Sequence, residues 1–192
     1  FTIGYFAFGY YFGWLDDVMM EQHFRGLFTG EPNSEAFYYH RGLSHIYAFL
    51  YRLNSSFPWY GVAMCGYIFI ATAGLFYAVS RIGGRIGISG WPPLALNAVL
   101  FFAVWFENVY LLTFTRVAIL LMGLALVNII IELFFAKPST GQRLKRLAIF
   151  NCMFAVGYLT RPEMVVFPVA LCALTVLLIA GIRRAGMNKA AI

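Results

Sequence analysis

Long apolar stretches separated by short polar segments dominate the chain. A helix needs about 20 apolar residues to cross a hydrocarbon core roughly 30 Å thick, and three stretches meet that length cleanly. Two more are interrupted or ended by a charged residue, which predicts a tilted, shortened or broken helix. With the apolar start of the chain, the predicted spans cover residues 1–14, 59–80, 93–114, 117–136, 147–160 and 164–182. The pattern therefore predicts an all-α, polytopic transmembrane helical bundle that forms one domain over residues 1–192.

The longest connection between spans, residues 16–57, is itself rich in apolar and aromatic positions. From Tyr39 to Leu53, a helical projection at about 100° per residue separates two kinds of side chain. The apolar face carries Leu43, Ile46, Tyr47, Leu50 and Leu53, and the polar face carries Arg41, His45 and Arg52. This pattern predicts an amphipathic helix that lies on the membrane surface.

Composition supports an integral membrane protein, because 61% of the residues are hydrophobic and only 11% are charged, far outside the soluble range. The net charge of +6 does not indicate a nucleic-acid partner, since the basic residues fall in short connections between apolar spans. Cys65, Cys152 and Cys172 lie inside apolar segments, where cysteine behaves as a small buried hydrophobe, so no disulfide framework is predicted. The chain opens with Phe1 inside an apolar segment, and we expect an N-terminal fragment of a longer protein.

Charge predicts the orientation of the spans. The connections 81–92, 137–146 and 183–192 hold nine of the 14 basic residues and no acid, so the positive-inside rule assigns them to the cytoplasm. Every acid except Glu132 falls on the other side. We therefore predict a multi-pass protein of the cytoplasmic (inner) membrane with loop 16–57 facing the periplasm or exterior. Glu132 is expected to pair with Lys137 or the basic loop that follows it.

Asp16 and Asp17 stand at the mouth of the first predicted span, directly after the uncharged segment 1–14. Carboxylates at such a position can bind a cation or take up a proton. Two adjacent carboxylates disfavour each other's ionisation, which a divalent cation such as Mg²⁺ or Mn²⁺, or a basic substrate group, relieves. Because neighbouring side chains point in different directions, one acid would act while the other orients it. The simpler interpretation is that both acids only end the span at the water interface.

Arginines near the same side are candidates for phosphate binding. Arg116 and Arg161 occupy the external ends of two spans, with Glu107 and Glu163 nearby. These four residues form either structural ion pairs or a shared polar pocket with the two aspartates.

The basic residues on the polar face of the amphipathic helix have two possible roles. Arg41, His45 and Arg52 either reach into lipid headgroups or, through Arg41 or Arg52, bind the phosphate of a lipid-linked substrate.

The order of these features resembles the integral-membrane glycosyltransferases of the GT-C type. Those proteins carry an acidic motif in the first external loop, matched here by Leu15-Asp16-Asp17, followed by membrane-lying helices, matched by the stretch from His40 to Leu53. The segments 29–32, 57–61 and 113–116 also look like bacterial multi-span proteins of this type. GT-C enzymes generally have more than six spans and often a soluble carboxy-terminal domain, and this chain shows neither.

The resemblance implies transfer of a sugar from a polyprenyl-phosphate donor to an acceptor at the outer face of the membrane. One aspartate would be the general base, or Asp16 and Asp17 together would hold a divalent metal against the donor phosphate. The phosphate-binding candidates are then Arg41, Arg116 and Arg161, and the other pocket candidates are His45, Glu107 and Glu163.

Two other functions fit parts of the sequence. A non-enzymatic accessory subunit of a larger membrane complex would use its aromatic residues, 19% of the chain, as contact surface. A lipid or solute transporter would need inward-facing charges near the membrane midplane. The charges instead gather toward one membrane face, which favours a reaction at the surface.

Overall fold

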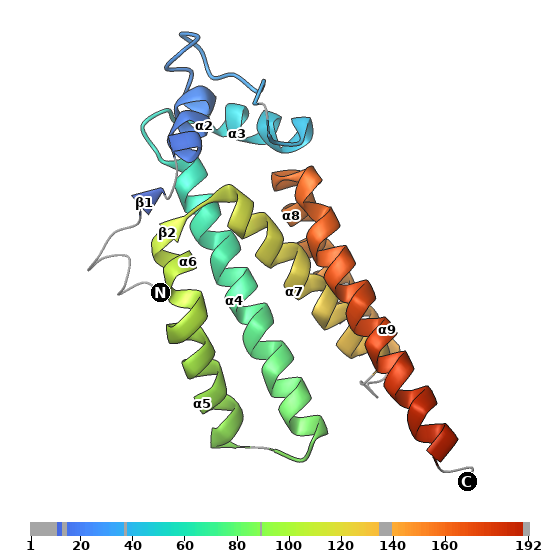
Figure 1. Ribbon diagram of the computed structural model, residues 1–192. Helices are drawn as coiled ribbons and strands as arrows, with labels where there is room; N and C mark the ends of the chain where they lie inside the picture. Colours follow the sequence, from blue (N-terminus) through green and yellow to red (C-terminus); the bar gives the residue numbers. More distant parts are fainter. Residues whose placement is uncertain (1–10, 13–14, 37, 89, 135–139, 190–192) are drawn as a thin grey trace.

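The computed structural model describes residues 11–12, 15–36, 38–88, 90–134 and 140–189, and most of these residues are helical (Figure 1). The predicted all-α class is confirmed. The predicted first span, residues 1–14, lies outside the described residues except for Tyr11 and Phe12.

The long helices lie side by side and run in alternating directions (Figure 1). They are α4 (Trp59–Arg85), α5 (Trp91–Leu100), α7 (Phe114–Phe134), α8 (Thr140–Thr160) and α9 (Val166–Lys189). A π-helical turn (Phe101–Trp105) and α6 (Phe106–Tyr110) continue α5, and a 3-10 turn (Pro162–Val165) precedes α9. The apolar helix α7 is central, because it packs against α4, α8 and α9.

Among the described residues, α4 and α7 are the two helices long and apolar enough to cross a membrane. Large apolar side chains also stay exposed on the flanking helices, among them Trp91 and Phe102 on the α5 side and Leu171 and Leu177 on α9. Apolar surface of this extent marks contact with lipid or with another protein. Together these features indicate a membrane protein.

Two shorter helices, α2 (Leu15–Arg25) and α3 (Arg41–Leu53), lie across the end of the molecule where α4 and α7 begin (Figure 1). We call this the α2–α3 end. The helix predicted within residues 39–53 is therefore confirmed, and His40 caps it by accepting a hydrogen bond from the amide of Gly42 at 3.2 Å.

The apolar face of α3 is not uniform. Leu43 and Tyr47 are buried against the protein, whereas Ile46 and Leu53 are 53% and 66% exposed. The helix packs on α2, α4 and α8, so its buried side also takes in Ser44. The exposed apolar side chains leave a second face free to contact a membrane surface.

A buried hydrophobic cluster lies beneath α2 and α3 and is rich in aromatic and methionine side chains. Its buried members are Met20, Phe24, Tyr39, Leu43, Tyr47, Tyr51, Tyr60, Met64, Ile68, Ala71, Leu112, Phe114, Val117, Leu121, Ala125 and Met153. Because members of this cluster come from loop 16–57 as well as from α4, α7 and α8, that loop is part of the folded core.

The predicted span 93–114 is broken near its end. After α6 the chain becomes extended at β2 (Leu111–Leu112), which pairs in parallel with β1 (Tyr11–Phe12), Tyr11 opposite Leu111. Extended backbone needs a partner strand for its N–H and C=O groups, and β1 supplies it. This pairing brings the starts of α2 and α7, which follow the two strands, next to each other.

Glu132 forms a buried charge cluster at the opposite end of the molecule. Its side chain is fully buried and accepts a hydrogen bond from the Tyr77 hydroxyl. Its Oε1 also lies 3.5 Å from Arg81 and 3.4 Å from Arg146. The predicted pairing with the following basic loop is confirmed for Arg146, whereas Lys137 lies outside the described residues. The cluster ties α4, α7 and α8 together.

The contact of α7 with α8 depends on Gly157. A Cβ atom at this position would lie 2.8 Å from the Met122 Cγ and 3.0 Å from the Ala118 carbonyl oxygen. We predict that Gly157→Ala lowers the free energy of unfolding by about 1–3 kcal/mol, because the two helices must separate. Reversible unfolding in detergent measures the loss.

Gly66→Ala is the matched control, since nothing lies within 4 Å of a Cβ there, and it should change the free energy of unfolding by less than about 0.5 kcal/mol. Equal losses in the two variants would contradict the close packing of α7 on α8.

Candidate functional site

Asp17 lies in the first turn of α2 and is fully buried. Its Oδ1 accepts two hydrogen bonds, from the Tyr60 hydroxyl and from the backbone amide of Phe114, each at 2.9 Å. Phe114 is the first residue of α7, where the amide groups lack partners within the helix and the helix dipole favours a negative charge. Asp17 thus joins the starts of α2, α4 and α7.

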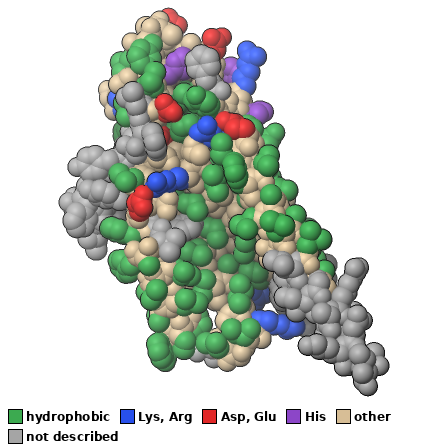
Figure 2. All heavy atoms as spheres, in the orientation of Figure 1, with side chains coloured by type: hydrophobic (Ala, Val, Ile, Leu, Met, Phe, Trp, Pro, Cys, Tyr) green, Lys and Arg blue, Asp and Glu red, His purple; other side chains and the backbone are tan. Residues whose placement is uncertain are grey.

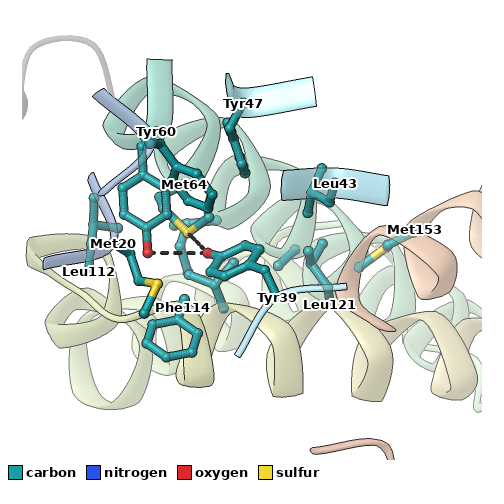
Figure 3. Packing of buried hydrophobic residues seen from close by; sticks show 14 of the residues in the cluster. Met20, Tyr39, Leu43, Tyr47, Tyr60, Met64, Leu112, Phe114, Leu121 and Met153 are labelled. Carbon is teal, nitrogen blue, oxygen red and sulfur yellow. Dashed lines mark hydrogen bonds between the residues drawn. The ribbon is translucent and has the colours of Figure 1, made fainter. Parts of the chain in front are cut away.

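Tyrosine hydroxyls extend this network away from Asp17. The Tyr39 hydroxyl donates to the Tyr60 hydroxyl at 3.2 Å, and Figure 3 shows the two groups facing each other beside the Met64 sulfur. The backbone amide of Tyr60 donates to the Tyr51 hydroxyl at 3.0 Å. Burial raises the pKa of Tyr39 well above its usual value, so this hydroxyl keeps its proton and remains a donor.

The second carboxylate oxygen of Asp17 is less well satisfied. Among the described residues, Oδ2 is buried and has no hydrogen-bond partner. Burial raises the pKa of Asp17 from 3.8 to about 6, against the lowering effects of the Phe114 amide and the Tyr60 hydroxyl. Desolvation outweighs both hydrogen bonds because it penalises the whole charged group. The carboxyl group, with its pKa of about 6, therefore changes protonation state near pH 6.

Asp16, in contrast, is exposed. The expectation that the two aspartates point in different directions is confirmed. Within the described part of the chain, no group of three or more His, Cys, Asp and Glu side chains could hold a metal ion. With one carboxylate buried and one exposed, the two do not face a single ligand, and the divalent cation stays a prediction.

Arg161 is the predicted phosphate-binding residue that lies near Asp17. Its guanidinium stands over the rings of Phe114 and Tyr38, at 4.7 and 4.9 Å from their centroids. Its Nε donates to Glu163 at 2.9 Å, and another of its nitrogens donates to Thr115. Because the Phe114 amide binds Asp17, Arg161 and Asp17 contact the same residue, and the positive charge of Arg161 lowers the pKa of Asp17.

The other candidates are placed differently. Arg116 forms an ion pair with Glu107 at 2.7 Å, and both side chains are largely exposed. Arg41 and His45 are exposed on α3, and within the described part of the chain the hydrogen bonds of Asp17 come from Tyr60 and Phe114 and not from either of them. The structure thus brings together Asp17, Arg161 and Glu163, and it leaves the other phosphate candidates as separate surface groups.

Sequence reasoning missed the direct partners of Asp17. A backbone amide such as that of Phe114 carries no sequence signal. Tyr60 is one of 12 tyrosines in the chain, and its place at the start of a span is equally typical of an interfacial aromatic. Thr115, which holds Arg161, follows the broken span and was equally hard to single out.

No protein-family model, curated protein or solved structure matches the chain. The function is therefore argued from the sequence pattern and from this geometry.

The raised pKa of Asp17 predicts a pH-dependent stability. The folded protein holds this proton up to about pH 6, whereas the unfolded chain releases it near 3.8. The folded state therefore binds more protons in this interval, and its stability falls as pH rises from about 4 to about 6. A shift of about 2 pKa units corresponds to roughly 3 kcal/mol.

We predict that Asp17→Asn removes this part of the pH dependence, as measured by the free energy of unfolding of both proteins from pH 4 to 7. Glu31→Gln changes an exposed acid of the same loop and should keep the wild-type dependence. A wild-type curve parallel to that of Asp17→Asn would contradict the raised pKa.

Proposed function

We propose that the chain belongs to a membrane glycosyltransferase of the GT-C type. The enzyme transfers a sugar from a polyprenyl-phosphate donor to an acceptor at the outer face of the membrane. The observation that carries this proposal is the Asp16-Asp17 pair, with one carboxylate anchored over the starts of α4 and α7 and its neighbour exposed beside it. An arginine, Arg161, stands over the ring of Phe114, whose backbone amide binds Asp17.

The exposed carboxylate of Asp16 is the group that can reach a substrate, so we assign it the role of general base. The acceptor hydroxyl oxygen forms a bond to the anomeric carbon as its proton passes to Asp16. The bond from that carbon to the phosphate oxygen breaks, and the polyprenyl phosphate leaves with the electron pair. Attack from the side opposite the leaving group inverts the anomeric centre.

Asp17 is a positioning residue in this scheme, because it is buried and holds the first turn of α2 in place through Tyr60 and Phe114. Arg161 is suited to the departing phosphate. Its Nε and one terminal nitrogen already bind Glu163 and Thr115, which fixes the guanidinium plane and leaves N–H groups for phosphate oxygens.

The proposed membrane orientation has support from the distribution of charge. In Figure 2 the visible acidic side chains lie toward the α2–α3 end, basic side chains appear there and at the opposite end, and mostly hydrophobic side chains cover the helices between. Arg81, Arg85 and Arg146 lie on helix segments at the opposite end. We propose that the chain crosses the inner membrane several times, with the basic end in the cytoplasm and loop 16–57 outside.

Sugar transfer by the full-length protein tests the catalytic assignment. We predict that Asp16→Asn lowers kcat by about 100-fold or more, the usual contribution of a general base. Arg161→Gln should raise the KM for the polyprenyl-phosphate donor about tenfold, since one charge-assisted hydrogen-bonding group is lost.

Glu35→Gln, an exposed acid of the same loop, is the control and should stay within about twofold of wild type, because nothing assigns it to the substrate. Full activity of Asp16→Asn would remove the catalytic role of Asp16. Full activity of Asp16→Asn and also of Asp17→Asn would end the glycosyltransferase proposal.

Labelling from outside the cell tests the orientation. In a cysteine-free background, Asn33→Cys in the external loop should react with a membrane-impermeant maleimide. Gly141→Cys, at the start of α8, should react only after the membrane is opened. The reverse pattern would invert the proposed topology.

A further inference from the structure

A groove runs along α7 between α4 and α9, and its lining residues take no part in the catalytic proposal. Its cavity volume is about 590 Å³, within the size range of ligand sites. The lining side chains on α7 and α9 are almost all apolar, from Ile119 to Ile131 and from Phe167 to Thr175. The hydroxyl of Thr175 donates to the carbonyl of Leu171 within α9, so it presents no free donor to the groove.

The lining of the groove changes from apolar to basic where the groove reaches the end of α4. Arg81 and Arg85 line it there, next to the apolar Ile82 and Ile86. Arg81 shares Glu132 with Arg146. No ion pair to Arg85 occurs among the described residues.

The charges at this end do not balance. One acid, Glu132, lies at this end and pairs with both Arg81 and Arg146. Arg85 adds a further positive charge at the groove, so these four groups together carry a net charge of +2. The remaining seven of the eight acids of the chain lie elsewhere in the sequence, in residues 16–35, at 107 and at 163. The groove end is thus complementary to an anion.

The length of the groove fits one membrane leaflet. From Ile119 to Ile131, twelve steps along α7 at about 1.5 Å each cover roughly 18 Å. Half of a hydrocarbon core about 30 Å thick is about 15 Å. An acyl chain of one leaflet can therefore lie along α7 while its headgroup stays level with the arginines.

We propose that this groove binds an anionic phospholipid of the cytoplasmic leaflet, with an acyl chain along α7 and the phosphate at Arg85 and Arg81. Basic pockets between membrane helices on the cytoplasmic side bind acidic headgroups in this way. A protein helix could also cover the apolar walls, but it would not account for the excess positive charge at one end. The proposal depends on the membrane orientation and is independent of sugar transfer.

Lipid titration followed by native mass spectrometry of the full-length protein in detergent tests the site. The probes are phosphatidylglycerol, which is anionic, and phosphatidylcholine, which has no net charge. We expect phosphatidylglycerol to bind about fivefold more tightly, the effect of one basic side chain on an acidic lipid. Arg85→Gln should abolish this preference. Lys145→Gln removes an exposed charge near the start of α8, at the same end of the molecule but outside the groove lining. This variant should keep the preference for phosphatidylglycerol.

A second variant tests the apolar part. Gly123 lines the groove, and a Cβ there would meet only the Pro168 Cβ, at 3.8 Å. Gly123→Leu should therefore fold, fill the groove and weaken the binding of both lipids about fivefold. Gly66→Leu, on the open side of α4, should leave binding within about twofold. Equal binding of the two lipids by wild type, or an unchanged preference in Arg85→Gln, would overturn the proposal. Unchanged binding in Gly123→Leu would do the same.

Discussion

The carboxylate of Asp17 is the contact on which the arrangement of the α2–α3 end depends. One oxygen accepts hydrogen bonds from the Tyr60 hydroxyl and the Phe114 amide. This single buried carboxylate therefore connects the first turns of α2, α4 and α7. A buried carboxylate is costly unless its oxygens are satisfied, and here only one oxygen has partners among the described residues. The unmet cost appears as the raised pKa of Asp17, about 6. The same contact leaves Asp16 at the surface, fixed relative to α4 and α7.

The sequence predicts the parts of this structure that depend on apolar length or on periodicity. Helices α4 and α7 follow from uninterrupted apolar runs, and α3 follows from its alternation of apolar and polar faces. The break at Leu111 was indicated only by the nearby charge of Glu107, because strand pairing with a segment about 100 residues away has no local pattern. From the sequence we expect the apolar face of α3 to contact the membrane, whereas in the structure the protein itself covers Leu43 and Tyr47 on that face.

The sequence identifies the acids and arginines of the candidate site, but it does not predict the contacts that join them. Charged residues at the ends of apolar runs are conspicuous, which is why Asp17 and Arg161 could be named. Their proximity depends on Phe114, whose amide binds one and whose ring contacts the other. Arg116 looks equivalent in the sequence, but Glu107 pairs with it at the surface. Five of the eight acids lie in residues 16–35, at or near the α2–α3 end, whereas Glu132, Arg81 and Arg85 lie at the opposite end.

A double-mutant cycle on Asp17 and Tyr60 tests the central contact most directly. The free energy of unfolding is measured for wild type, Asp17→Ala, Tyr60→Phe and the double variant at a single pH. If the carboxylate joins α2 to α4 as described, the two changes are coupled by about 1–2 kcal/mol. Effects that add without coupling would show that Asp17 does not hold these helices together, and the positioning of Asp16 would lose its physical basis.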